Sequence, residues 1–193
     1  MDEWVKRALA KWPDVPALYG WLRLNRRGHW LIRGERIANA RIRTVINRNY
    51  AADDAGCWFF QNGPQRGYMA LDYAPFILRA QADERLITHN DLTVTRIEAA
   101  SLDEDGSVTL LTEHGPGLLD DHDLDWALSR LLCDGEAVSE AALLDALEKP
   151  GGRDSGLQLR VASGDPVPVQ RCDSAALPDH YHFVRDPEPA DGD

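Results

Sequence analysis

The residues that most resemble a chemical site lie in LLDDHDLDWALSRLL (118–132), where Asp120, Asp121, His122, Asp123 and Asp125 fall within six positions. Carboxylates and imidazoles bind divalent metals, so this stretch could serve a metal-dependent hydrolase. A metal needs converging ligands, and on a helix only residues three or four positions apart share a face. The Asp120/Asp123 and Asp121/Asp125 pairs each supply two carboxylates and no third ligand. The stretch therefore supports a hydrolase weakly, and we expect no metal.

The same stretch also has the pattern of a helix that begins with a cap. Apolar residues recur at helical spacing at Leu124, Ala127, Leu128, Leu131 and Leu132. This spacing predicts one buried helical face that continues to residue 132. Asp120 or Asp121 would cap the free N–H groups of the first turn and lie at the positive end of the helix dipole. We favour this structural interpretation.

Histidines and cysteines give no specific metal signature. DHYH (179–182) is expected to place His180 and His182 on the same side of a short strand, but two imidazoles alone do not define a metal site. Cys57, Cys133 and Cys172 are widely spaced and odd in number. This spacing predicts free thiols rather than a disulfide framework or a zinc site.

The loop QNGPQRGY (61–68) carries the better binding signal. Asn62 precedes a glycine and a proline, which predicts a hairpin turn, and Gln65 and Arg66 add amide and guanidinium donors. Arginine suits phosphate or carboxylate because its fork donates two parallel hydrogen bonds. Asn62, Gln65 and Arg66 are therefore the predicted ligand-binding residues, with Arg41 and Arg43 as charged neighbours. The alternative is an exposed hairpin with ordinary polar residues.

Charge is distributed unevenly along the acidic chain. The formal net charge is −11, yet residues 1–48 carry 11 Lys/Arg against 4 Asp/Glu, and the remainder carries 10 against 28. Such asymmetry can mark an anion-binding face, or the two halves can complement each other. Arginine-rich composition, with 18 Arg and 3 Lys, is a further explanation. The overall acidity argues against non-specific nucleic-acid binding, which requires phosphate neutralisation.

Motifs for nucleophilic catalysis and for standard nucleotide binding are missing. The sequence contains no GxSxG or SxxK and no Walker or GxGxxG glycine loop. We therefore expect a non-enzymatic protein without a cofactor.

The elements that must position these residues predict an α+β fold. Helical patterns occur at 2–12, 39–50, 124–132 and 139–147, and a hairpin is expected at 21–33. Between 56 and 119, short β-branched and aromatic runs alternate with turns, which is typical of an antiparallel meander. A second hairpin crosses 164–165, and 177–184 could add a last strand.

Two stretches share the order strand, turn, strand, helix, at 28–50 and at 106–132. This order suggests a duplicated unit. We expect an N-terminal helix (1–13), an N-terminal lobe (14–80), a C-terminal lobe (81–185) and a disordered, acid- and proline-rich tail (186–193).

INRNYAADDAGCWFFQNGPQRGYMALDYAPFILR (46–79) and LPDHYHFVRDPEP (177–189) resemble an uncharacterised proteobacterial family, one of the domains of unknown function. The order of elements also looks like that of a second uncharacterised bacterial family. That family has a duplicated α+β core, a C-terminal half similar to pleckstrin-homology (PH) folds and a suspected nucleotide-like ligand. The resemblance implies a two-lobed α+β fold with a PH-like C-terminal half and a binding role without catalysis.

Together these patterns favour a cytoplasmic protein, because the chain has neither a signal peptide nor an apolar run that could span a bilayer. The first hypothesis is a module that binds or senses a small anionic, nucleotide-like ligand between the lobes. The alternative is a protein-interaction or oligomerisation module, for instance a homodimer, that uses Trp4 and Trp12 of the N-terminal helix.

Overall fold

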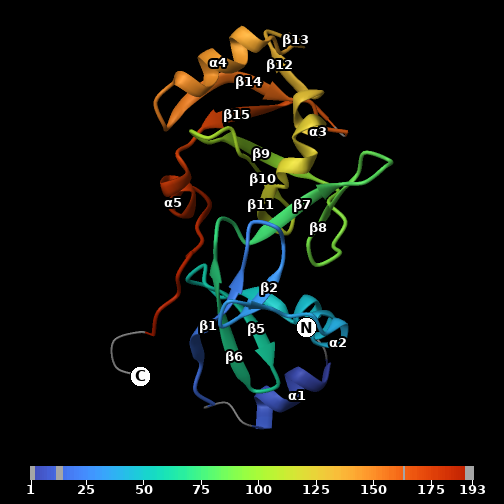
Figure 1. The fold of residues 1–193 in the computed structure, drawn as a ribbon, viewed down its shortest axis with the longest axis vertical. Coiled ribbons are helices and arrows are strands. Elements are labelled where there is room, and N and C mark those ends of the chain that lie inside the picture. The colour runs from blue at the N-terminus through green and yellow to red at the C-terminus, as the bar shows by residue number, and fades with distance from the viewer. Residues whose placement is uncertain (1–2, 12–14, 163, 190–193) are drawn as a thin grey trace. The chain divides into compact units, whose positions relative to one another are not determined.

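A computed structural model describes residues 3–11, 15–162 and 164–189 (Figure 1). The chain forms two compact units, Met1–Pro75 with His182–Asp193 (unit 1) and Phe76–Tyr181 (unit 2). The expected α+β class is confirmed, because the described residues form short strands in two sheets together with α- and 3-10 helices. Among the described residues, no helix has the length and apolar character needed to cross a membrane.

Unit 1 contains a six-stranded sheet with the strand order β3-β2-β1-β6-β5-β4. Its elements are α1 (Glu3–Lys11), β1 (Leu18–Leu24), β2 (Trp30–Ile32), β3 (Glu35–Arg36), α2 (Ala40–Arg48), β4 (Tyr50–Ala52), β5 (Trp58–Asn62) and β6 (Gln65–Leu71). β1 pairs with β6 in parallel, whereas the other neighbours are antiparallel. The parallel pair is a departure from a simple meander.

Helix α2 forms because its start is capped and one residue of its apolar face is buried. The Asn39 side chain accepts hydrogen bonds from the backbone N–H groups of Arg41 and Ile42, which confirms the expected cap. Ile46 is buried, and the Trp30 indole donates to the Asn47 side chain at 2.7 Å. This hydrogen bond ties α2 to β2, so the strand alternative for this segment is not adopted.

Both ends of the chain belong to unit 1. The Val184 N–H donates to the Gly56 carbonyl, and the Leu71 N–H donates to the Arg185 carbonyl. Gly56 has a φ of +80°, and a Cβ atom there would lie 2.5 Å from the His182 carbonyl oxygen. Glycine is therefore required where the returning C-terminal segment approaches the backbone.

The C-terminal segment has two parts. Residues 186–189 form no regular element, but Pro187 is buried. The rest of the expected tail, 190–193, lies outside the described residues.

Unit 2 contains a nine-stranded sheet with the order β13-β12-β14-β15-β9-β10-β11-β7-β8. Its elements are β7 (Phe76–Ala80), β8 (Leu86–Thr88), β9 (Ile97–Leu102), β10 (Val108–Thr112), β11 (Gly115–Leu119), η1 (Asp121–Asp123), α3 (Leu124–Leu128), β12 (Leu131–Cys133), β13 (Glu136–Ala137), α4 (Glu140–Glu148), β14 (Arg153–Leu159), β15 (Val167–Arg171), η2 (Ser174–Ala176) and α5 (Leu177–Tyr181). β7 pairs with β11, and β9 with β15, in parallel.

The nine-stranded sheet curls so that its two ends approach each other. Glu84, in the turn between β7 and β8, accepts a hydrogen bond from the Trp126 indole of α3 at 2.8 Å. Its carboxylate lies 2.7 Å from the Arg130 guanidinium, directly before β12. These contacts connect the β8 end of the strand order to the β12 end.

The two units share a strand–turn–strand–helix motif, at 30–48 and 131–148. In each turn, two successive residues have positive φ: Arg33 and Gly34 at 49° and 84°, Asp134 and Gly135 at 52° and 83°. Positive φ at both central residues is typical of a type I′ hairpin turn. The stretch 106–132 also runs strand, turn, strand and helix, but 131–148 is the copy that repeats this turn.

The predicted long helix over 124–132 is wrong. α3 ends at Leu128, whose side chain is 43% exposed, and Leu131 lies in β12 and is 4% exposed. The helical spacing arises because a five-residue helix is followed by a strand with buried leucines. The Asp134-Gly135 turn then returns the chain as β13, so the segment from Leu131 cannot remain helical.

The predicted strand over 177–184 is also wrong for most of its length. Leu177–Tyr181 is helix α5, with Pro178 in its first turn, where a proline is tolerated. His182 has a φ of 56° directly after the helix. His180 and His182 are therefore not neighbours on one side of a strand.

Candidate functional site

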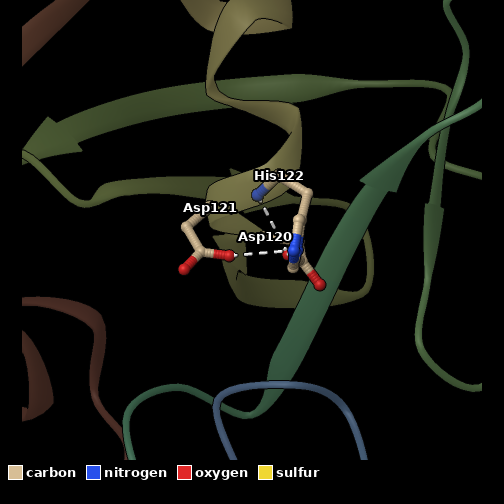
Figure 2. A group of neighbouring side chains, drawn as sticks. All are labelled: Asp120, Asp121 and His122. Atoms are coloured by element: carbon tan, nitrogen blue, oxygen red, sulfur yellow. Dashed lines mark hydrogen bonds and ion pairs between the residues drawn. The ribbon is translucent and has the colours of Figure 1, made fainter.

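The acidic stretch begins a helix, as its capping pattern predicts (Figure 2). Asp120 is buried and caps η1, because its Oδ1 accepts hydrogen bonds from the His122 backbone N–H and from His122 Nδ1, at 3.2 and 2.9 Å. Arg79 Nε lies 3.4 Å from Asp120 Oδ2. Burial acts to raise the pKa of Asp120, but the hydrogen bonds from His122 and the charge of Arg79 outweigh it and hold the pKa at about 2.

Asp120, Asp121 and His122 each offer a ligand atom within 4.8 Å of the others. However, His122 Nδ1 already contacts both carboxylates, at 2.9 Å from Asp120 and 3.2 Å from Asp121. Asp123 Oδ2 accepts from the Ala80 N–H. The polar groups therefore hold η1 in place, and Asp125 is not part of this group.

The predicted binding loop is the β5–β6 hairpin, and its donors bind the chain itself. Gln61 is fully buried, and its amide nitrogen donates to the carbonyls of Gly63 and Gln65 at 3.0 and 3.2 Å. Its amide oxygen accepts from Arg66 Nε at 3.3 Å. The Gln65 amide donates to the Pro16 carbonyl. Gln61, a buried amide that determines the hairpin structure, was not among the predicted residues.

The five predicted ligand residues form two groups. Asn62, Gln65 and Arg66 lie on the hairpin, whereas Arg41 and Arg43 lie in the first turn of α2. Arg43 donates to the Ala38 carbonyl at 2.8 Å, so it stabilises the start of its own helix. No hydrogen bond between described residues joins the two groups, and their role in binding stays a prediction.

Helix α1 contacts the same hairpin. A Cβ atom on Gly63 would lie 3.6 Å from Trp4 Cζ3 and 3.8 Å from the Cβ atom of Ala8. Trp4 nevertheless remains 44% exposed. Trp12, the other residue of the predicted interaction surface, lies outside the described residues. The interaction surface stays a prediction.

Unit 2 contains a cavity of about 320 Å³ that the sequence patterns did not indicate. Its basic lining residues are Arg85, Arg96, Arg130 and Arg160, and its apolar lining includes Leu86, Val94, Ile97, Trp126 and Val161. We call it the arginine cavity. It lies where the two ends of the curled sheet approach, since β8 contributes from one end and Arg130 and Arg160 from the other.

Charge composition makes this gathering of arginines unusual. Unit 1 carries 13 Lys/Arg against 11 Asp/Glu, whereas unit 2 carries 8 against 21. Four of these 8 basic residues line the arginine cavity. The sequence signal that could have indicated this cavity is the small number of basic residues between 76 and 181.

Three of the four guanidiniums have a carboxylate partner. Arg85 pairs with Asp83 at 2.6 Å, and Arg96 pairs with Glu98 at 2.5 Å. The Arg130 guanidinium pairs with Glu84 and also lies 4.5 Å from the centre of the Trp126 ring. The side chain of Arg160 is exposed, and within the described ranges its guanidinium forms no ion pair.

Glu113 fixes one wall of the cavity. Its carboxylate accepts hydrogen bonds from the N–H and the hydroxyl of Thr95, at 2.6 and 2.7 Å, and from the Arg96 N–H. Partial burial acts to raise the pKa of Glu113, but these hydrogen bonds outweigh it and hold the pKa at about 2. The segment before β9 is therefore anchored by a carboxylate that stays ionised.

A second cavity, of about 650 Å³, lies in unit 1. Its charged lining residues balance, with Arg23 and Arg33 against Asp186 and Glu188. Arg33 lies 3.7 Å from the centre of the Trp21 ring, and Arg23 pairs with Asp72. Balanced charge makes this cavity a weaker candidate for an anion than the arginine cavity.

Comparisons with known proteins support the fold and leave the activity open. A solved DUF1285 family protein from Silicibacter pomeroyi DSS-3 is 13% identical, with a TM-score of 0.54 over 81% of this chain and 84% of that chain. A DUF1285 family protein from Shewanella baltica OS155 is 18% identical, with a TM-score of 0.42 over 53% and 86%. The first likeness shows the fold alone. A search of curated proteins gave no match.

The family assignment comes from the sequence itself. Residues 1–188 match the model of a family described as "Protein of unknown function (DUF2946)". This match confirms the expected membership of an uncharacterised family. The chain belongs to this family of proteins of unknown function.

Proposed function

We propose that the chain is a non-catalytic module that binds a small anionic ligand in the arginine cavity. The observation that carries this proposal is the gathering of half of the basic residues of an acidic unit around one cavity. Guanidinium groups suit carboxylate and phosphate because their planar fork donates paired hydrogen bonds. A cavity of this size lies within the range typical of small-molecule sites.

The charge balance at the cavity also favours an anion. Asp83, Glu84 and Glu98 pair with three of the four arginines, so Arg160 supplies the one lining guanidinium without a carboxylate partner in the described ranges. Elsewhere unit 2 is strongly acidic, which would repel an anion from most of its surface. An anion that reaches the cavity would find Arg160 without a carboxylate partner and three further guanidiniums held in place by theirs.

A thermal-shift and calorimetric titration of the full chain tests the proposal. The probes are inorganic phosphate, adenosine monophosphate and octanoate, each in a buffer without other multivalent anions. At least one should raise the Tm, because a ligand at a hundred times its Kd stabilises a native protein by about 2.7 kcal/mol. Arg160→Gln should weaken binding of that probe, whereas Arg66→Gln should leave it unchanged.

The matched pair of variants distinguishes the two candidate locations. Both substitutions remove one exposed guanidinium, but Arg160 lines the cavity in unit 2 and Arg66 lies on the hairpin in unit 1. Loss of binding in Arg66→Gln alone would move the site to the hairpin residues predicted from the sequence. The absence of binding by all three probes would contradict the proposal.

A further inference from the structure

We infer that the arginine cavity takes an amphipathic anion, with one carboxylate or phosphate group on an apolar body. This inference rests on the proposed function and specifies its ligand class. It depends on three features of the cavity: its apolar lining, the number of guanidiniums that have no carboxylate partner, and the contact of Arg130 with the Trp126 ring.

The apolar lining extends over several separate segments. Leu86 at the start of β8 is 3% exposed, and Val94, Ile97 and Val161 are half-buried. In contrast, the side chains of Arg85, Arg96 and Arg160 are exposed. The cavity therefore offers apolar surface in its interior and cations where it opens to solvent. A ligand that matches this division has an apolar body and a charged end that stays near water.

The ion pairs limit how much negative charge the cavity can neutralise. Arg85, Arg96 and Arg130 each already have a carboxylate within 2.7 Å. A ligand with several phosphates would have to displace those carboxylates to contact these three guanidiniums. Arg160 can accept one anionic group without any displacement. One head group per ligand is therefore the best match.

The aromatic ring in the cavity is partly used by the chain. The Arg130 guanidinium lies over the Trp126 ring, 4.5 Å from its centre, and the indole N–H donates to the Glu84 carbonyl. A nucleobase that stacked on this face would have to displace Arg130 and its ion pair with Glu84. The cavity volume of about 320 Å³ is also at the lower end of the range for ligand sites. Aliphatic contact with the cavity wall does not require this displacement.

A chain-length series of free acids tests the inference on the full chain. Calorimetric titration with butanoate, hexanoate and octanoate should show Kd falling about fourfold per methylene, the expected gain from burying one CH₂ group. Octan-1-ol, which has the same apolar body without the charge, should bind at least about tenfold more weakly than octanoate.

Two variants separate the head-group contact from the apolar contact. Arg160→Gln should raise the Kd of every acid by about tenfold and leave the dependence on chain length unchanged. Val161→Ser should reduce the gain per methylene and affect butanoate least. Val138→Ser is the matched control, because Val138 is also half-buried in unit 2 but does not line the cavity.

The possible results bear differently on the inference and on the proposed function. Equal affinity along the acid series, or tighter binding of phosphate or adenosine monophosphate than of octanoate, would overturn the amphipathic ligand and leave anion binding standing. Absence of binding by every anion would overturn both. Co-sedimentation with phosphatidylglycerol vesicles that Arg160→Gln abolishes would overturn the free-acid ligand, because a membrane lipid would then supply the anionic group.

Discussion

The β5–β6 hairpin of unit 1 and the arginine cavity of unit 2 contain the same kinds of residue, but their polar groups have different partners. In each, a guanidinium lies 4.5 Å from the centre of an aromatic ring: Arg66 over Phe59 and Arg130 over Trp126. In the hairpin, Gln61 binds Arg66 and two backbone carbonyls. In the cavity, Arg160 retains an unpaired guanidinium within the described ranges. The two regions therefore differ in whether the chain itself occupies the donors, and this difference is the reason for placing the proposed site in the cavity.

The largest expected effect concerns β12, the strand that directly follows Arg130 of the cavity. Leu131→Ala should lower the free energy of unfolding of unit 2 by about 2–5 kcal/mol, because this side chain is 4% exposed at the start of β12. Leu128→Ala is the matched control and should cost less than about 1 kcal/mol, since Leu128 is 43% exposed. Urea denaturation measures both. A larger loss of stability in Leu128→Ala than in Leu131→Ala would instead support the single helix over 124–132 that the sequence predicted.

The second effect tests whether the hairpin really uses its own donors. Gln61→Ala should lower the stability of unit 1 by about 2–3 kcal/mol, because two carbonyls and Arg66 lose their partner at a fully buried position. Gln65→Ala, which removes one hydrogen bond to Pro16, should cost less than about 1 kcal/mol. If Gln61→Ala left the stability unchanged, the hairpin donors would not be engaged by the chain, and the hairpin would no longer differ from the cavity in this respect.

The third effect is a dependence on pH that belongs to unit 2. Burial, with the nearby charge of Arg79, lowers the pKa of His89 from 6.5 to about 3, and its Nδ1 accepts from the Ile77 N–H. In the unfolded chain the His89 imidazole binds a proton below about pH 6.5, whereas in the folded chain it does so only below about pH 3. Stability is therefore complete above pH 6.5 and is lost as the pH falls towards 3, by about 2 kcal/mol between pH 7 and 5.

Urea midpoints at pH 7, 6 and 5, followed by hydrogen exchange in unit 2, measure this loss. His89→Gln should be less stable at pH 7 but should lack the slope, because glutamine does not titrate. A wild-type midpoint that stays constant from pH 7 to 5 would contradict the assignment. Below pH 4, Asp120 and Glu113 add a second loss, since both pKa values are depressed to about 2.

The smallest expected effect falls on the residue that first suggested chemistry. His122→Ala should cost less than about 1 kcal/mol, because its contact with Asp120 comes from a side chain that is 75% exposed, and the His122 backbone N–H still donates to Asp120. Asp120→Ala should cost about 1–2 kcal/mol, since it removes a helix cap. Differential scanning calorimetry can compare the two. If His122→Ala proved the more damaging, the stretch would need an explanation beyond capping.

Local features were predictable from the sequence, because their causes are local. Asn39 and Ser139 cap α2 and α4 through hydrogen bonds to residues two or three positions ahead. The hairpin turn was predicted from Gly63, because glycine readily adopts a positive φ, and the structure has 57° there. The error at 124–132 was also avoidable, because Asp134-Gly135 is a strong signal for a type I′ hairpin turn.

The arginine cavity could not be predicted in the same way. Its four arginines lie at positions 85, 96, 130 and 160, and the last three are separated by at least 30 positions in the sequence. Only the curl of the sheet and its parallel pairs bring them together, and pairing over such distances leaves no periodic signal in the sequence. The hairpin was predicted as a binding site because its polar residues are adjacent in the sequence. The same adjacency lets Gln61 form hydrogen bonds with Gly63, Gln65 and Arg66.

The return of the C-terminal segment to unit 1 has a consequence for biosynthesis. Because Gly56 and Leu71 bind residues 184 and 185, unit 1 cannot be completed until those two residues have left the ribosome. Unit 2 is continuous from Phe76 to Tyr181, so all of its strands emerge earlier. Domains usually fold from the N-terminus during synthesis. In this protein the continuous unit 2 can be completed before unit 1, which still lacks the hydrogen bonds of residues 184 and 185 when Tyr181 has been made.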